Sequence, residues 1–185
     1  SLKVVGDHHQ LSTRQRKAVA RGACAPSAVQ KRTMKRLQAD QLRGRALAID
    51  GFNCLITVEA MLSHAPLFRG RDGALRDLAS VHGTYRSVRE TEHALQLLVE
   101  LLARPVLASV QFFLDRPVGN SGRTRARLEQ VCSAAGLPAA IELSNHVDRA
   151  LVEGGAVVAS SDSWILDRAP AWVDLPAMLL AEQSY

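Results

Sequence analysis

Three short, mostly apolar segments of this chain each lead into an aspartate, and stretches with helical spacing separate them. The segments are 46–49, 106–114 and 156–159, and the aspartates are Asp50, Asp115 and Asp162. Apolar runs without strict alternation are typical of strands buried on both faces, as in a parallel sheet. Strands that alternate with helices build such a sheet through right-handed crossovers. We therefore expect an α/β fold with a mainly parallel sheet of four or five strands and helices on both faces.

The remaining elements follow from the same periodicities. Helical spacing of apolar residues predicts helices over 12–23, 26–42, 55–63, 90–104, 121–135 and 176–181, and a short helix from 162. Two further strands are expected at 139–143 and 172–173. The Asp72-Gly73 pair favours a hairpin within residues 66–77.

Positive charge is concentrated at the N-terminus. Residues 1–44 hold ten of the 23 Lys and Arg residues but only two acidic residues. Gly44 interrupts the helical pattern, so we predict a basic helical extension over 1–44 and an α/β domain over 45–185. A basic arm favours a polyanion partner such as RNA or DNA, and the alternative is a solvated helical face.

Composition excludes several classes of protein. The three cysteines are odd in number and widely spaced, which argues against a disulfide framework and a zinc knuckle. No charge-free run approaches the roughly 20 apolar residues that span a bilayer. We expect no membrane partner and a cytoplasmic setting. The sequence leaves the oligomeric state open, and a homo-oligomer is one of the alternatives.

The strand-end aspartates carry the chemistry. Ligands of open α/β sheets bind at the carboxyl ends of the strands, where side chains of separate strands converge. Asp50, Asp115 and Asp162 lie at such ends, and Asp148 follows the strand expected at 139–143. Converging carboxylates repel one another unless a cation intervenes, and their hard oxygens suit Mg²⁺ or Mn²⁺. Attack of water on a phosphodiester is the chemistry that this set suggests. The alternative is that each aspartate caps the helix that follows it.

Polar residues near these aspartates are candidates for substrate binding. Residues 115–123 form a strand-to-helix loop with small residues, a hydroxyl and two arginines, which suits a phosphate or, alternatively, an ordinary capped turn. Asn53 lies three residues after Asp50, where its amide either orients that carboxylate, contacts phosphate or caps the helix that follows. The candidate substrate-binding residues are Asn53, Arg116, Asn120, Ser121, Arg123 and Ser163.

Four of these segments resemble the motifs of PIN-like and NYN-type nucleases. Residues 48–53, Ala-Ile-Asp-Gly-Phe-Asn, resemble the opening strand of that superfamily, and residues 112–115 resemble its central strand. Residues 145–148 and 157–163 resemble its last two acidic positions. The likeness spans roughly residues 45–175.

The chain also resembles a prokaryotic family of unknown function that is described as PIN-like. The shared segments are Val5-Gly6-Asp7, Leu11 to Arg16, Arg71-Asp72-Gly73, Arg76-Asp77 and the stretch from Asp115 to Gly122.

The resemblance implies a three-layer PIN-like fold and cleavage of RNA by a metal-dependent nuclease. It assigns catalysis to Asp50, Asp115, Asp148 and Asp162, with Mg²⁺ or Mn²⁺ held by Asp50, Asp115 and Asp162. Trp164 stands where many NYN-type enzymes carry a second acid. This departure favours the alternative, a non-catalytic module of the same fold that binds RNA or a ribonucleoprotein. A haloacid-dehalogenase-type phosphohydrolase is disfavoured because Phe52 stands where its second aspartate is needed.

Overall fold

A five-stranded parallel sheet forms the centre of the protein. The computed structural model describes residues 2–78 and 88–183. In these residues the strand order is β5-β4-β1-β6-β7, and all four strand pairs are parallel. The strands are β1 (Ala46–Asp50), β4 (Ser109–Asp115), β5 (Ala139–Ser144), β6 (Val157–Ala159) and β7 (Trp172–Val173). The expected α/β class and mainly parallel sheet are confirmed.

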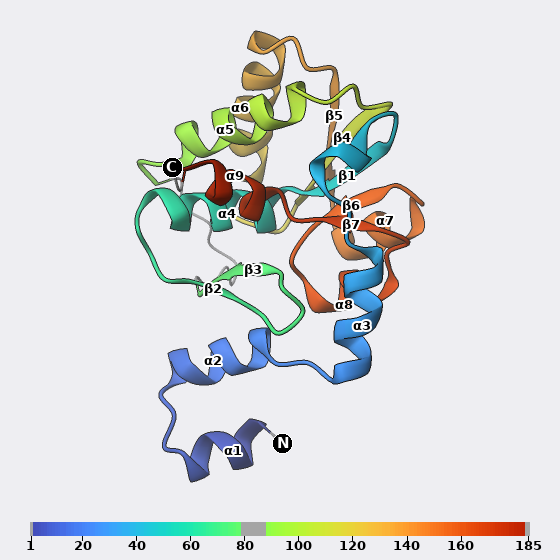
Figure 1. Cartoon of the computed structure of the whole chain (residues 1–185). Helices are drawn as coiled ribbons and strands as arrows, with labels where there is room; N and C mark the ends of the chain where they lie inside the picture. Colours follow the sequence, from blue (N-terminus) through green and yellow to red (C-terminus); the bar gives the residue numbers. More distant parts are fainter. Residues whose placement is uncertain (1, 79–87, 184–185) are drawn as a thin grey trace.

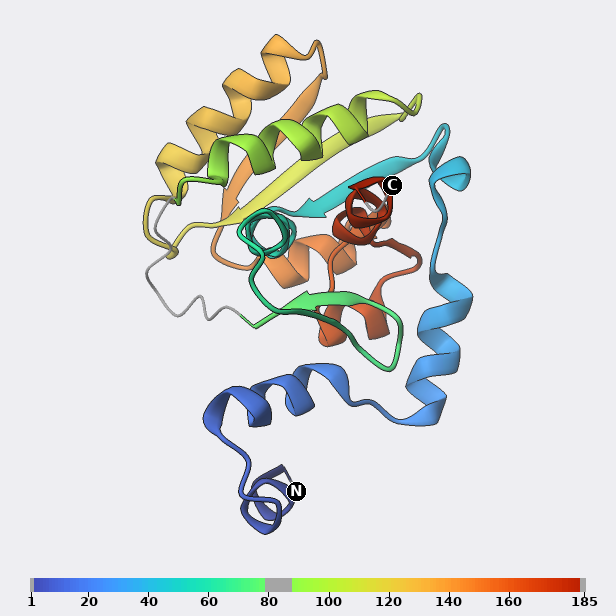
Figure 2. The ribbon, with the colours of Figure 1, turned by 60° about the vertical axis from the view of Figure 1, so that its left-hand side comes forward.

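Helices cover both faces of this sheet (Figures 1 and 2). The larger core lies between the sheet and four helices, α4 (Gly51–Leu62), α5 (Thr91–Ala103), α6 (Ser121–Ala134) and α9 (Leu175–Gln183). A smaller core lies between the other face and two helices, α7 (Val147–Glu153) and α8 (Ser163–Arg168). No helix among the described residues has the length and apolar character needed to cross a membrane.

The pleat of β1 explains why its residues are apolar without alternation. Successive side chains of a strand point to opposite faces. Leu47 and Ile49 join the larger core, whereas Ala48 joins Phe113 in the smaller one. Because both faces of β1 are covered, polar residues are excluded until the strand ends at Asp50.

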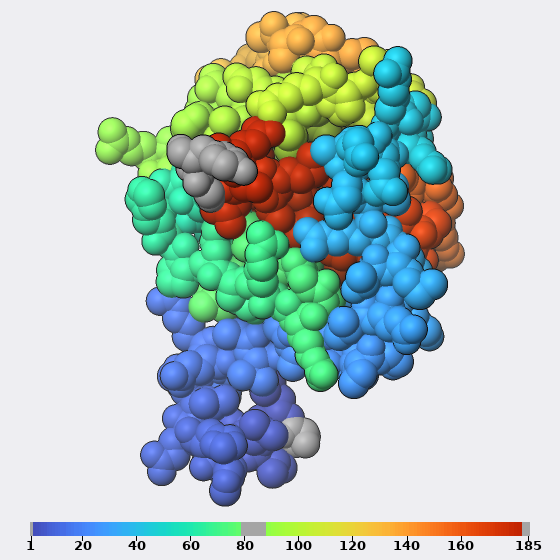
Figure 3. All heavy atoms as spheres, viewed as in Figure 1, coloured from blue at the N-terminus to red at the C-terminus, as the bar shows by residue number. Residues whose placement is uncertain are grey.

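Two of the N-terminal helices lie against a small hairpin and α8. The N-terminal helices are α1 (Leu2–His8), α2 (Thr13–Gly22), α3 (Pro26–Lys35) and a 3₁₀ helix, η1 (Ala39–Leu42). The hairpin consists of β2 (Leu67–Arg69) and β3 (Leu75–Asp77), and Arg71 N–H donates to the Gly22 carbonyl at 2.8 Å. Helix α1 projects from the body and contacts α2, which lies against the hairpin, whereas α3 packs on α8 (Figures 1 and 3). The division of the chain at residue 44 stays a prediction.

Two helix boundaries differ from expectation for tertiary reasons. The helix expected over 26–42 ends at Lys35, because Arg36 forms a parallel bridge with Trp172 and Leu37 N–H donates to the Trp172 carbonyl at 2.8 Å. The helix expected from residue 55 begins at Gly51, because the Asp50 carboxylate caps it. Helices α1 and α7 were not expected from the sequence pattern.

The junction between β1 and α4 is close-packed around Gly51. A Cβ atom at Gly51 would lie 2.5 Å from Leu114 Cδ2 and 2.9 Å from the Phe113 carbonyl oxygen. Gly51→Ala is therefore expected to lower the free energy of unfolding by about 1–3 kcal/mol. Gly122→Ala is the matched control, because a Cβ at Gly122 in α6 meets nothing within 4 Å. The control should be neutral or stabilise by up to about 1 kcal/mol. Chemical denaturation compares the two, and equal stabilities would contradict close packing at this junction.

Candidate functional site

The candidate site lies between β1 and β6, where the order of the strands in the sheet reverses. Helix α4, which follows β1, packs on one face of the sheet, and α8, which follows β6, packs on the other. The two strands are neighbours, so their carboxyl ends flank the crevice in which open α/β sheets bind ligands. Asp50 ends β1, and residues 160–162 follow β6. Asp115 ends β4 on the other side of β1.

Asp50 is the most buried acid of the site. Only 7% of the residue is exposed. Its Oδ2 accepts a hydrogen bond from Ser160 Oγ at 2.8 Å, and its Oδ1 accepts one from Asn53 N–H at 3.3 Å. Burial raises the pKa of Asp50 to about 7 against the effect of the Ser160 hydrogen bond, and the charge of Asp115 adds to the increase. No cationic side chain is among the causes of this shift.

The other three acids continue this group of like charges. Partial desolvation raises the pKa of Asp115, and the nearby charge of Asp148 adds to it. Partial desolvation also raises the pKa of Asp148, which lies in the first turn of α7, and Asp162 adds to that shift. The structure therefore places Asp50, Asp115, Asp148 and Asp162 at one edge of the sheet, close enough for their charges to interact.

The chemistry of these donors fits a hard cation. All four are carboxylates, and Mg²⁺ commonly binds through one or two carboxylates while it retains several waters. Across residues 2–78 and 88–183, no group of three or more His, Cys, Asp or Glu side chains is close enough together to ligate a metal directly. Asp162 also has a local role, because its Oδ1 accepts hydrogen bonds from Trp164 N–H at 2.7 Å and Ile165 N–H at 3.3 Å.

Two of the candidate substrate-binding residues are held by structural contacts. Asn53 lies inside α4 and is not its cap, and its Oδ1 accepts from Ser161 N–H at 2.9 Å and from Ser161 Oγ at 3.0 Å. Ser163 Oγ accepts from Arg32 at 3.2 Å and from Arg76 at 3.5 Å. Both side chains thus position the segment that carries Asp162.

The loop between β4 and α6 is held mostly by its own contacts. Ser121 Oγ donates to the Arg116 carbonyl at 3.1 Å, and Arg116 donates to the Leu143 carbonyl at 3.0 Å. Asn120 has a left-handed φ of 65° and makes no side-chain cap to α6, and Arg123 is exposed in the first turn of that helix. The loop starts at Asp115, so it joins the acidic edge at that residue.

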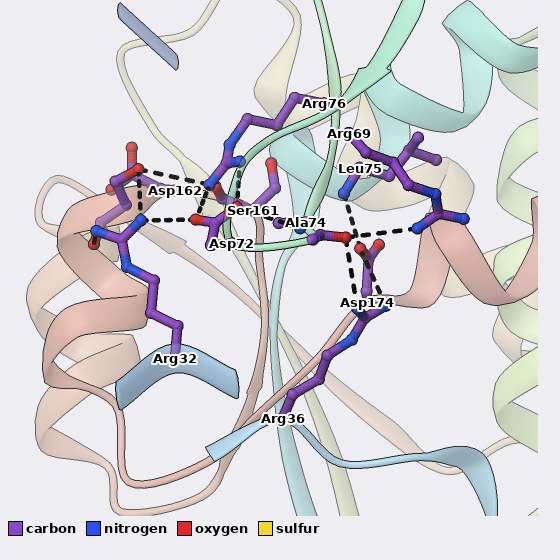
Figure 4. Close-up of polar contacts among 12 residues, drawn as sticks. Arg32, Arg36, Arg69, Asp72, Ala74, Leu75, Arg76, Ser161, Asp162 and Asp174 are labelled. Carbon is purple, nitrogen blue, oxygen red and sulfur yellow. Dashed lines mark hydrogen bonds and ion pairs between the residues drawn. The ribbon is translucent and has the colours of Figure 1, made fainter. Parts of the chain in front are cut away.

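A buried cluster of two arginines and one aspartate supports the acidic edge (Figure 4). Arg76 of β3 donates to Asp72 Oδ1 at 2.7 Å and Oδ2 at 2.8 Å, and Arg32 of α3 donates to Oδ2 at 2.6 Å. We call Arg32, Asp72 and Arg76 the arginine clamp. Its three residues are each at most 4% exposed. Burial alone would raise the pKa of Asp72, but the hydrogen bonds from Arg76 and Arg32 lower it to about 2.

The arginine clamp reaches the acids through the segment that follows β6. Arg76 Nε donates to the Ser161 carbonyl at 3.0 Å, and Arg32 Nε donates to Asp167 of α8 at 2.7 Å. The clamp therefore joins α3, the hairpin and α8 behind the acidic edge. Sequence reasoning assigned no role to these residues or to Ser160. The only available signal was the Arg-Asp-Gly and Arg-Asp segments at 71–73 and 76–77.

Fold and site together define a three-layer parallel α/β domain with four acids at the carboxyl edge of its sheet. A family model described as a domain of unknown function (DUF5616) matches residues 39–178, and the chain belongs to that family. A second model, described as a protein of unknown function (DUF434), matches residues 1–35. An uncharacterized protein of Methanocaldococcus jannaschii is 29% identical over 168 residues, which cover 90% of this chain and 79% of the relative. No solved structure matches the chain.

The arginine clamp is expected to lose its contribution to the free energy of unfolding at acidic pH. Because the folded pKa of Asp72 is about 2, below the unfolded value of about 3.9, its ionised form stabilises the fold above pH 4. Asp72→Asn leaves two buried guanidinium groups without their anion and should cost about 3–5 kcal/mol near pH 7. The difference between wild type and variant should shrink as pH falls from about 4 towards 2.

Asp167→Asn is the control for this measurement. Asp167 also binds Arg32, but 43% of its side chain is exposed, so its loss should cost about 1 kcal/mol or less. Urea denaturation at a series of pH values measures both variants. A cost for Asp72→Asn that is the same at pH 7 and pH 3 would contradict the ionised clamp.

Proposed function

We propose that this chain is a metal-dependent nuclease-like domain that hydrolyses RNA phosphodiesters. The observation that carries the proposal is the convergence of Asp50, Asp115, Asp148 and Asp162 at the carboxyl edge of the sheet, where three of them have raised pKa values. Within residues 2–78 and 88–183 no arginine forms an ion pair with these acids. Acids that repel one another in this way form the electrostatic arrangement that a divalent cation relieves.

The PIN-like assignment of the fold is part of this proposal. The segments that resemble PIN-like and NYN-type nucleases fall at the ends of β1, β4 and β6 and at the start of α7. These are the positions from which a parallel sheet presents side chains to a ligand. The order of the motifs along the chain and their common edge support the assignment.

Each residue of the site has a role in this reaction. Asp50, Asp115 and Asp162 would hold Mg²⁺ or Mn²⁺ mainly through bound water, because no three acids of the described residues are close enough for direct ligation. The ion would supply charge neutralisation at the phosphate and an acidified water. Asp148 would accept the proton of the attacking water, because its raised pKa makes it a better base near neutral pH. The oxygen of that water would bond to phosphorus as the bond to the leaving ribose oxygen breaks, and the leaving oxygen would take up a proton from solvent.

Basic and polar residues beside Asp115 would bind the substrate phosphates. Arg116 and Arg123 carry the charge for this contact, and Asn120 and Ser121 lie at the N-terminus of α6. Asn53 and Ser163 would act as positioning residues through Ser161 and the arginine clamp.

The basic N-terminal segment would add affinity for RNA. Part of its positive charge is neutralised within the protein, because Arg21 pairs with Asp77 and Arg32 with Asp72. Lys3, Arg14 and Lys31 are exposed. These side chains would contact phosphates without reading sequence.

A non-catalytic RNA-binding module is the second candidate function. The observation that favours it is the capping of α8 by Asp162, which gives this acid a structural use. Exposed Trp164 stands two residues later, where many NYN-type enzymes carry an acid.

Asp115→Asn separates the two candidate functions. In the wild type, Mn²⁺ at 100 times its Kd should stabilise the fold by about 2.7 kcal/mol and raise the melting temperature by about 5–10 °C. The variant removes one charge with little change of shape. It should lose most of this shift and all cleavage of single-stranded RNA, while its stability in chelator is unchanged or slightly higher. Calorimetry with chelator and with Mn²⁺ measures both states.

Asp40→Asn is the matched control for Asp115→Asn. Asp40 is an exposed aspartate in η1, which precedes the amino end of β1 and lies far along the sheet from its acidic edge. The control should keep the full metal shift and full cleavage. Equal metal shifts in wild type and Asp115→Asn, with RNA still bound, would overturn the nuclease and leave the binding module.

Neutralisation of exposed arm residues tests the RNA contact without disturbing the arginine clamp. The double variant Arg14→Ala/Lys31→Ala should weaken RNA binding and reduce the slope of log K against log salt by about 0.7 for each lost phosphate contact. Filter binding over a series of salt concentrations measures the slope. An unchanged slope would show that these two side chains do not contact RNA.

A further inference from the structure

Trp164 is an exposed aromatic residue beside the acids. It is 44% exposed, whereas the second tryptophan, Trp172, is 0% exposed and donates its indole N–H to the Arg32 carbonyl at 2.8 Å. The Arg168 guanidinium lies 4.1 Å from the centre of the Trp164 ring, and Arg168 also donates to the Trp164 carbonyl at 3.1 Å. The ring is therefore held in place by a cation on one face and is not a loose surface side chain.

The ring lines one groove together with two acids of the candidate site. The groove has a volume of about 580 Å³, within the range of roughly 300–1,000 Å³ typical of small-ligand sites. Its walls come from the end of β4, the start of α7, and α8. They include Asp115, Asn145, His146, Asp148, Trp164 and Arg168.

Charge decides which part of a nucleotide this groove can accept. Arg149 and Glu153 also line it, but they pair with each other at 2.8 Å. Asp115 and Asp148 then outweigh Arg168, so a bare phosphate is repelled. An uncharged, planar group with polar edges suits the same walls, because Trp164 offers a stacking surface and Asn145 and His146 offer hydrogen-bonding groups.

We propose that this groove binds a nucleobase of single-stranded RNA by stacking on the Trp164–Arg168 pair. The inference rests on the proposed function and extends it to the substrate class, because a stacked base requires an unpaired strand. The backbone N–H of Trp164 donates to the Asp162 carboxylate at 2.7 Å, so the turn that presents the ring also fixes one of the acids. A base in the groove would hold its strand beside Asp115 and Asp148.

Tryptophan fluorescence tests the stacking directly. The chain has two tryptophans, and since Trp172 is buried, quenching by a ligand reports on Trp164. The probes are an oligouridylate of about eight nucleotides and an abasic ribose-phosphate strand of the same length, both in chelator so that no metal-dependent cleavage shortens them. The oligouridylate should quench the fluorescence and the abasic strand should not, although both carry the same phosphate charge. Failure of the oligouridylate to quench, or equal quenching by both strands, would overturn the inference.

Variants at Trp164 test its contribution to affinity. Trp164→Ala should weaken oligouridylate binding by about 5- to 100-fold, whereas Trp164→Phe should retain most of the affinity because it keeps an aromatic face. Neither variant should change the weak binding of the abasic strand. The fluorescence of Trp172 and the melting temperature show that each variant is folded. Equal affinities for oligouridylate in wild type and Trp164→Ala would overturn the stacking site.

The outcome is distinguishable from failure of the proposed function. Base-dependent quenching in a protein that cleaves no RNA would support the stacking site and overturn hydrolysis. Metal-dependent cleavage with no dependence of binding on the base would support hydrolysis and overturn the stacking site.

Discussion

The arginine clamp, in which buried Asp72 pairs with Arg32 and Arg76, is the interaction on which the rest of the structure depends. Arg32 comes from α3, and Asp72 and Arg76 come from the hairpin. Arg76 also donates to the Ser161 carbonyl, and Arg32 donates to the Ser163 carbonyl in α8. These elements are far apart in sequence, so none is held in place by local propensity. Removal of one buried partner leaves uncompensated charge, which makes such a cluster costly to break. The clamp therefore fixes the hairpin and α3 relative to the acidic edge.

The fold was predictable where local pattern and burial agree. The strands at 46–50 and 157–159 are buried on both faces and are apolar almost throughout. The edge strand at 139–144 is apolar except for Glu142 and Ser144, and the helices between the strands have helical spacing. The pattern failed where a distant contact decides the outcome. The end of α3 is set by pairing with Trp172, which no local signal reveals. Helix α7 is short and is defined mainly by the packing of Val147 and Leu151 on the sheet.

The acids of the candidate site were predictable because parallel topology fixes where strand ends meet. Once β1, β4 and β6 are neighbours, Asp50, Asp115 and Asp162 must share one edge of the sheet. Their partners were not predictable, because contacts such as Ser160 with Asp50 depend on loop conformation. The role of Trp164 was hidden for the same reason. A tryptophan in a sequence is as consistent with core packing as with a groove, and only its exposure and the guanidinium over its ring separate the two.

Two buried aspartates of this chain show opposite electrostatic outcomes. Asp72 has two arginines around it and a pKa of about 2, whereas Asp50 has a serine hydroxyl, a backbone N–H and other acids around it and a pKa of about 7. Arg76 neutralises the buried carboxylate of Asp72. It also donates to the Ser161 carbonyl, and Ser160, the neighbour of Ser161, donates to Asp50. The positive charge of Arg76 lies one segment away from the acids, where it stabilises the fold without forming an ion pair with them in the part of the chain that the structure describes. Fold stability and negative potential at the sheet edge are therefore supplied by separate residues, and the second is available for a ligand.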